Sequence, residues 1–206
     1  MMAFMGCSNL ESVDAPSLTM IAGLAFQSCS TLTHLSVASD CNILTSALTG
    51  SGLSSVTFGG IEMYPDSHSD YYPKDSVLNT TSSVAYNSLY DALLNANNGD
   101  TIQLQKDFTS KFNSNVNKEN ITLDMNGHTL SFSPSYGLNI NDGSLTIIGA
   151  GSIIIAESEG IAVTGGDLHL NDVSIIYDPE VPNQGDCVIL VTGSSPDSDV
   201  ASSVTV

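Results

Sequence analysis

Apolar residues recur along the first part of the chain at a spacing of about 22 residues, within the range of solenoid repeats. The frame Ala-Phe-x-x-Cys-Ser-x-Leu-x-x-(Val/Leu) occupies residues 3–13 and again residues 25–35. A degenerate copy covers residues 53–58, one period after the equivalent positions of the second copy. A fixed period of this length is typical of a solenoid, because each coil buries its apolar face only by stacking on its neighbours.

Stacking in register places equivalent side chains of successive coils about 5 Å apart. We therefore expect Phe4 to lie on Phe26, and Cys7 on Cys29. That spacing permits a disulfide, but cysteine also behaves as a small hydrophobic residue in such cores. The repeat predicts that both cysteines are buried and reduced.

This frame resembles the BspA-type leucine-rich repeat. The resemblance is carried by residues 21–29, which read Ile-Ala-Gly-Leu-Ala-Phe-Gln-Ser-Cys, and by Ala15-Pro16 at the end of the first coil. It covers residues 1–60 and implies a short leucine-rich repeat solenoid. The third copy lacks the Ala-Phe pair and the Cys, which is typical of a terminal coil.

The period is interrupted at residues 61–87, where turn-forming residues mix with aromatics, and this composition predicts a linker. His68 lies there between Asp66 and Asp70, and a ligand or metal patch is the alternative to an ordinary connector, which we favour. Residues 88–96 then predict a short helix with Ser88 as its N-cap and one apolar face. We expect this helix to cap the apolar end of the segment that follows.

From residue 88 onward, short strand signatures recur at a similar period, separated by turns rich in Gly and Asn. Three signatures per coil predict a three-sided parallel β-helix whose alternate side chains point inward. The first signature is at 121–123, 145–147, 168–170 and 204–206, the second at 130–132, 153–155 and 175–177, and the third at 138–140, 161–163 and 188–190.

This half resembles the pectin-lyase-like right-handed parallel β-helix, on the strength of residues 99–104, 121–130 and 145–151. The resulting fold class is mostly β, with a leucine-rich repeat solenoid at 1–60, a linker at 61–87 and a β-helix with an N-terminal capping helix at 88–206. Both ends interrupt a coil, so we expect a chain truncated at both ends and self-association through the open solenoid ends.

The composition is strongly acidic. Four Lys and no Arg stand against 22 Asp and Glu, which gives a formal net charge of −18. Such a surface repels phosphate backbones, so we expect no nucleic-acid binding. No stretch approaches the roughly 20 apolar residues of a membrane span, and the first residues lack the pattern of a signal peptide.

The sequence offers no recognisable catalytic set. β-Helix lyases commonly use an Arg base, and the chain has none; the polygalacturonase-type Asp-Asp pair is also missing. Asp124 with His128 has the composition of an acid–base pair, but a structural role in the Asn126-Gly127 turn is favoured. Asp197-Ser198-Asp199 is a weak Ca²⁺ candidate. A carboxylate pair for glycoside hydrolysis remains an alternative among Glu157, Glu159, Asp178 and Glu180.

We therefore predict a protein that is not an enzyme and has no metal site and no cofactor. The candidate binding residues form one outward column of the β-helix. The expected function is an extracellular or cell-surface scaffold for adhesion or ligand display, with a host or bacterial surface glycan or protein as partner. The alternatives are a phage virion appendage and a fragment of a β-helix carbohydrate-active enzyme. The column comprises Thr122, Thr146, His169 and Thr205.

Overall fold

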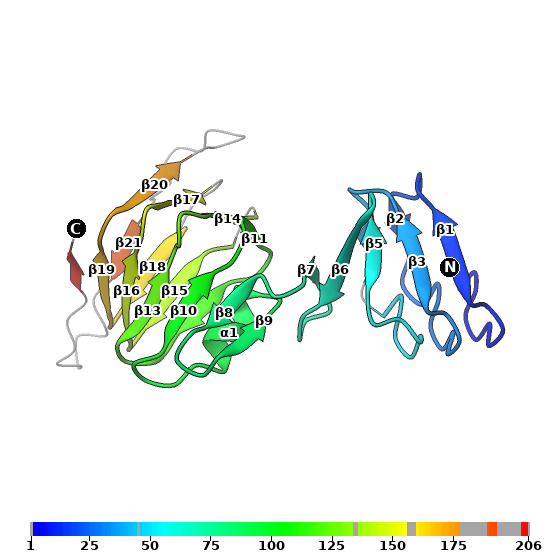
Figure 1. Ribbon diagram of the computed structural model, residues 1–206, viewed down its shortest axis with the longest axis horizontal. Coiled ribbons are helices and arrows are strands. Elements are labelled where there is room, and N and C mark those ends of the chain that lie inside the picture. The colour runs from blue at the N-terminus through cyan, green and yellow to red at the C-terminus, as the bar shows by residue number, and fades with distance from the viewer. Residues whose placement is uncertain are drawn as a thin grey trace. The chain divides into compact units, whose positions relative to one another are not determined.

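The computed structural model describes residues 2–44, 46–133, 136–155, 160–177, 189–192 and 203–205. The chain divides into two compact units, Met1–Lys74 and Asp75–Val206. The fold is mostly β, and the chain forms a β-solenoid of about 7 turns (Figure 1).

Parallel strands one coil apart build the first unit. β1 (Ser12–Ala15), β3 (His34–Val37) and β5 (Val56–Phe58) pair side by side, while β2 (Met20–Ile21) pairs with β4 (Asn42–Ile43). The register places Ser12 opposite His34 and Ser36 opposite Thr57. The repeat of about 22 residues found in the sequence is therefore the number of residues that separates paired positions on neighbouring strands.

The aromatic stack of the first unit is confirmed. The rings of Phe4 and Phe26 are parallel within 4°, with centroids 5.1 Å apart. Cys29 is buried, and its thiol donates to the carbonyl oxygen of Phe4 at 2.9 Å. Cys7 is exposed, so the prediction that both cysteines are buried was wrong for Cys7. Its partner coil covers one side of Cys7 only, whereas Cys29 lies between two coils.

We expect the three described free thiols of the folded protein to react in two classes. Cys7 is an exposed free thiol, whereas Cys29 and Cys41 are buried, and burial followed by the charge of Asp40 raises the pKa of the Cys41 thiol. Only the thiolate is nucleophilic, so the buried thiols should react slowly until the chain unfolds. Ellman titration should therefore show a fast phase that loses one thiol in Cys7→Ser. An unchanged fast phase in that variant would contradict this assignment.

The segment 61–87, expected as a linker, contains strands that belong to both units. β6 (Ile61–Pro65) and β7 (Tyr71–Pro73) form an antiparallel hairpin that extends the β1–β3–β5 sheet beyond β5. β8 (Val77–Asn79) and β9 (Val84–Tyr86) form a second hairpin, which joins the second unit. Both hairpins cover a sheet edge with antiparallel strands.

The second unit has three sheets, named here the first, second and third face, and each coil contributes one strand to each face. Neighbouring strands within a face are parallel, apart from the β8–β9 hairpin. The first face contains β10 (Thr101–Leu104), β13 (Ile121–Asp124), β16 (Ser144–Ile148), β19 (Asp167–Leu170) and β22 (Ser203–Thr205). The second contains β11 (Phe108–Ser110), β14 (Thr129–Phe132), β17 (Gly151–Ile155) and β20 (Val173–Tyr177), and the third β12 (Ser114–Val116), β15 (Leu138–Asn141), β18 (Ile161–Thr164) and β21 (Ile189–Thr192).

Buried aliphatic ladders run through this unit from coil to coil. On the first face Ile121 is opposite Leu145, and Leu145 is opposite Leu168. Leu168 in turn is opposite Val204, as predicted. The third face differs from the prediction in its last coil. Ile161 is opposite Ile189, so the expected signature at 188–190 is one residue out of register.

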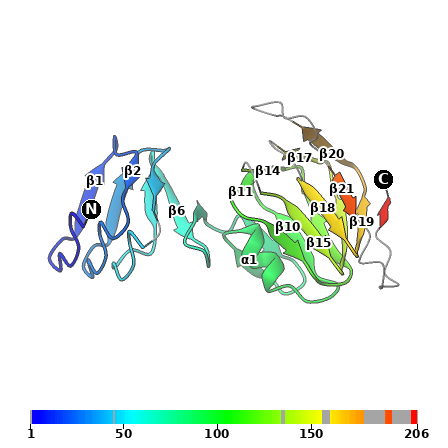
Figure 2. The same cartoon turned by 180° about the vertical axis from the view of Figure 1, so that it is seen from behind.

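The predicted short helix is α1 (Leu89–Leu94), and its N-cap is confirmed. The Ser88 hydroxyl accepts from the backbone N–H of Asp91 at 3.1 Å, which satisfies one of the donors that a helix start leaves open. The helix buries Leu89, Ala92 and Leu93. It contacts β12 as well as β8 and β9, which Figure 1 labels beside it, and Figure 2 shows the helix from the other side, at the β10 end of the second unit.

Two positions at the corner between the third and first faces have no room for a side chain. A Cβ atom on Gly143 would lie 2.7 Å from the Lys118 carbonyl oxygen, and one on Gly166 would lie 2.4 Å from the Gly143 carbonyl oxygen. The preceding residues, Asp142 and Gly165, have φ values of 53° and 72°. Glycine is therefore required where successive backbones approach this closely.

Candidate functional site

The structure brings the predicted outward column of the first face together. Thr122 is opposite Thr146, Thr146 is opposite His169, and the backbone of Thr205 pairs with that of His169. The two threonines are half-buried and His169 is exposed. Adjacent strands of a sheet are about 4.8 Å apart, so the described side chains of the column are evenly spaced hydroxyl groups followed by an imidazole.

The sequence analysis missed one member of this column. Thr101 on β10 is opposite Thr122 and extends the column by one coil. Its signal was present in the sequence, because Thr101-Ile102 occupies the same frame as Thr122-Leu123. We call Thr101, Thr122, Thr146 and His169 the threonine column.

A second row of polar side chains lies next to this column. The Nε2 atom of Gln105 donates to Gln103 Oε1 at 2.8 Å, and Gln103 Nε2 donates to Asp124 Oδ2 at 2.7 Å. The other carboxylate oxygen of Asp124 accepts from the backbone N–H of Asn126 at 2.9 Å. Asp124 therefore holds the Asn126-Gly127 turn, which is the structural role favoured from the sequence.

The partner of His128 is Asp107 of the preceding coil. His128 Nδ1 lies 3.4 Å from Asp107 Oδ1, and that oxygen also accepts from the backbone N–H of Thr129 at 3.0 Å. The Thr129 N–H, followed by the His128 side chain, lowers the pKa of the Asp107 carboxyl. Asp107 thus remains a carboxylate at neutral pH and is suited to accepting hydrogen bonds. The two residues lie a whole coil apart in sequence, so no local motif marked the pair.

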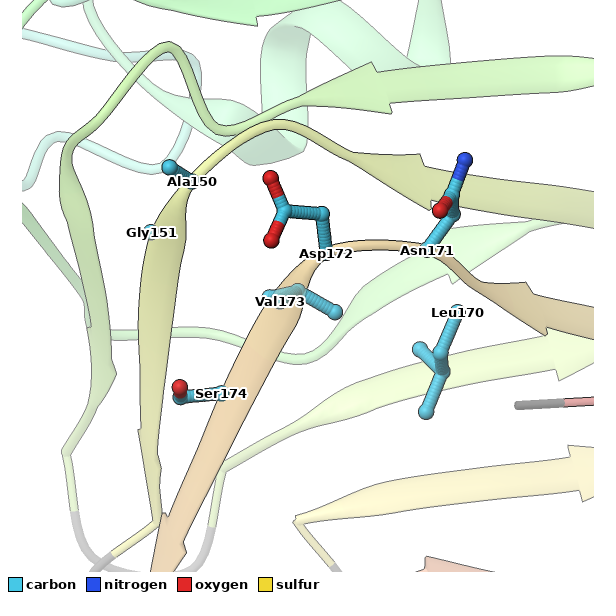
Figure 3. A pocket seen from close by; sticks show the side chains of 7 residues that line it. All are labelled: Ala150, Gly151, Leu170, Asn171, Asp172, Val173 and Ser174. Atoms are coloured by element: carbon cyan, nitrogen blue, oxygen red, sulfur yellow. The ribbon is translucent and has the colours of Figure 1, made fainter.

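A surface cavity lies at the corner between the first and second faces. Its volume is about 380 Å³, and it is lined by Ala150, Gly151 and residues 170–174. Asp172 has a φ of 57°, and Figure 3 shows its carboxylate turned toward the segment that carries Ala150 and Gly151. The lining mixes Leu170 and Val173 with three polar side chains, which suits a small polar ligand better than an apolar one.

The Asp66–Asp70 turn connects β6 to β7. Asp66 Oδ1 accepts from the backbone N–H groups of His68 and Asp70, at 2.9 and 3.0 Å. His68 Nδ1 is 4.0 Å from Asp66 Oδ2. These contacts organise the turn from within, as in an Asx turn. In the ranges that the structure covers, no three His, Cys, Asp or Glu side chains are grouped to hold a metal ion.

Several sequence candidates fall on residues that the structure does not describe. The carboxylates of Glu157, Glu159, Asp178 and Glu180 and the Asp197-Ser198-Asp199 segment all lie outside the described residues. Within the described part of the chain, no helix is long and apolar enough to cross a membrane.

The described part of the second unit thus presents three polar features on its first face and adjoining corner. They are the threonine column, the row formed by Gln105, Gln103 and Asp124, and the corner cavity.

Comparison of the chain with protein-family models, with curated proteins and with solved structures gave no match in any of the three.

Proposed function

We propose that this protein is a non-catalytic extracellular or cell-surface scaffold that displays the threonine column to a surface glycan or protein. The observation that carries the proposal is the in-register column itself, in which each coil adds one polar side chain to a regular row. A row of hydroxyl groups at a fixed spacing matches an extended, repetitive ligand, because each coil can make the same shallow contact.

The finer fold assignment belongs to the same proposal. We infer that the first unit is a leucine-rich repeat of the BspA type, supported by the parallel pairing of strands one repeat apart and by its Phe4–Phe26 stack. For the second unit we infer a pectin-lyase-like right-handed β-helix, supported by three parallel faces. The contacts of α1 with β12 and the β8–β9 hairpin support its role as the cap of that helix.

Two described carboxylates, one on the first face and one at its corner with the second face, support display rather than chemistry. Both oxygens of Asp124 accept hydrogen bonds, and Asp107 Oδ1 accepts from the Thr129 N–H and contacts the His128 ring, so these oxygens hold corners. A general acid in glycoside hydrolysis needs a raised pKa, whereas the pKa of Asp107 is lowered. These groups are arranged as fixed acceptors on the solenoid surface.

The test measures glycan binding by a variant in which bulky side chains cover the threonine column. Thr122→Lys with Thr146→Lys places two long side chains on adjacent coils of the column, and we expect it to reduce binding to an array of immobilised surface glycans at least tenfold, the cost of about 1.4 kcal/mol. Thr109→Lys with Ser131→Lys is the matched control, because these residues are paired on adjacent coils of the second face and the charge change is identical.

Equal losses in both double variants would show that added charge, and not the column, controls binding, and would overturn the proposal. The same glycans should yield no new reducing ends and no unsaturated products on incubation with the protein. Turnover of any of them would contradict the non-catalytic assignment.

A further inference from the structure

The corner cavity between the first and second faces is hollow because one coil carries no large side chain there. A Cβ atom on Gly151 would lie 2.5 Å from the His128 carbonyl oxygen of the preceding coil, and Gly149 has a φ of 88°. Both positions therefore require glycine, and Ala150 between them adds only a methyl group. Ala150 and Gly151 line the cavity as a floor whose shape is set by backbone packing, so the cavity exists before any ligand binds.

The next coil supplies a polar wall. Asp172 and Ser174 line the cavity, and Figure 3 shows the Asp172 carboxylate and the Ser174 hydroxyl on the side of their segment that faces Ala150 and Gly151. In the part of the chain that the structure describes, no hydrogen bond or ion pair engages the Asp172 carboxylate. Its oxygens are therefore open to a donor from a ligand.

The remaining lining includes an apolar surface. Leu170 and Val173 flank the Asn171-Asp172 corner in sequence and contribute aliphatic side chains to the cavity. The methyl group of Ala150 extends this surface beside the carboxylate. The volume of about 380 Å³ is near the lower end of the 300–1,000 Å³ typical of small-molecule sites. A short hydrocarbon stem with a polar head matches this division of the lining.

The charges around the cavity favour a cation. Asp172 lines it, and a second carboxylate, Asp124, lies against Gly149, because a Cβ atom on that glycine would be 2.7 Å from Asp124 Oδ1. The donors to Asp124 are a Gln side chain and a backbone N–H, which are neutral. No lysine lines the cavity, and the chain has no Arg. The formal net charge of −18 adds a field of the same sign, which attracts cations.

Two imidazoles lie next to this corner in the fold, and they do not reverse its charge. His128 belongs to the preceding coil, where its ring lies 3.4 Å from the Asp107 carboxylate. His169 precedes Leu170 and belongs to the threonine column rather than to the lining of the cavity. The carboxylates of Asp107, Asp124 and Asp172 outnumber the two imidazoles, so the corner remains negative even with both rings protonated.

We propose that the corner cavity binds an alkylammonium group, a primary ammonium head on a stem of about four methylene groups or more, as on a lysine side chain. The ammonium donates to the Asp172 carboxylate and the Ser174 hydroxyl, and the stem lies on Ala150 and Val173. A divalent metal ion is a poorer match, because no three His, Cys, Asp or Glu side chains of the described ranges are grouped to hold one. No residue of the threonine column lines the cavity, so this site goes beyond the proposed display function and does not depend on it.

The experiment compares pentylammonium with pentanol, which has the same stem without the charge. Both are titrated into the full chain at low salt, and binding is followed by ligand-observed NMR. We expect the ammonium to bind about fivefold more tightly, near the upper limit for an exposed ion pair. The preference should shrink at physiological salt, where surface charges are screened.

Three variants assign the effect to the cavity. Asp172→Asn should abolish the preference, because it keeps the shape of the wall and removes its charge. Asp142→Asn is the matched control, since Asp142 is also an exposed aspartate at a coil corner, with a φ of 53° compared with 57° for Asp172, and does not line the cavity. Ala150→Leu should weaken both probes by filling the floor, and the exposure of Ala150 means that the fold is retained.

Two further probes distinguish the sources of the ammonium group. Nα-acetyl-lysine methylamide represents a lysine side chain of a protein, and cadaverine represents a free diamine. Both should bind, and the probe that loses the larger factor in affinity in Asp172→Asn identifies the source that fits the cavity.

Absence of saturable binding of pentylammonium up to about 50 mM, well above a millimolar dissociation constant, overturns the proposal. Equal binding of pentylammonium and pentanol overturns it as well. Equal losses in Asp172→Asn and Asp142→Asn would show that diffuse negative charge, and not the cavity, attracts the ammonium. Undiminished binding by Ala150→Leu would place the bound ammonium elsewhere on the chain and would equally reject the site.

Discussion

Leu145→Ala is expected to lower the free energy of unfolding by about 3 kcal/mol, within the 2–5 kcal/mol typical of buried leucines. Leu145 is fully buried on the first face, where it is paired with Ile121 on one side and Leu168 on the other. Removal of its side chain opens a cavity inside a continuous ladder. The coils on either side cannot close it without breaking the strand register, so little of the loss is recovered.

Urea unfolding of the full chain, followed by circular dichroism, measures this loss. Thr146→Ala is the matched control, because it lies next in the same strand but points outward and should change the free energy of unfolding by less than about 0.5 kcal/mol. Similar midpoints for Leu145→Ala and Thr146→Ala would show that the inward ladder does not carry the stability of this unit.

Asp100→Ala is expected to destabilise the second unit by about 2–3 kcal/mol, the cost of unsatisfied buried polar groups. Asp100 is buried, and its Oδ2 atom accepts from Asn97 N at 2.9 Å and from the Nδ2 of Asn79, also buried, at 2.7 Å. Asn79 in turn accepts from the backbone of Thr81 and Ser82 within the β8–β9 hairpin. The substitution therefore leaves donors of two segments without an acceptor.

The same carboxylate makes stability depend on acid pH. The Asn97 N–H, followed by the Asn79 side chain, lowers the pKa of Asp100 below its ordinary value of 3.8. A lowered folded-state pKa means that the contribution is complete above the unfolded-state pKa and is lost as pH falls through the folded-state value. The stability difference between wild type and Asp100→Asn should thus shrink below about pH 4. A difference that is constant from pH 7 to pH 3 would contradict this.

Where successive coils repeat the same local pattern, the sequence was sufficient to predict the fold. The Ala-Phe frame predicted the Phe4–Phe26 stack, and the alternating triplets at 121–123, 145–147 and 168–170 predicted the first-face ladder. In both cases each side chain lies on the equivalent side chain of the next coil. The repeat length and the alternation of inward and outward positions therefore define which residues are in contact. Three members of the threonine column, Thr122, Thr146 and His169, followed from the same rule.

The hydrophobic pattern did not predict the structure in two situations. In one, a run of apolar residues does not show which side chains point inward. In the other, side chains of different coils contact each other without a shared motif. Residues 188–191 are all apolar, so no alternation distinguishes one register from the next, and Ile189 rather than Val188 lies opposite Ile161. The Asp107–His128 contact joins two turns that show no shared motif. The strands of 61–87 were hidden because prolines and turn residues mask the short antiparallel hairpins there.

The last first-face pairing has an evolutionary consequence. Leu168 is opposite Val204, and the chain between these two partners is longer than the chain between any preceding pair of first-face partners on parallel strands. The length of the chain between two paired strands is thus independent of how they pair. Closing a longer loop costs only about 0.6 kcal/mol for each doubling of its length. Selection can therefore lengthen and diversify the corner segments of such a chain while the ladders that hold it together stay unchanged.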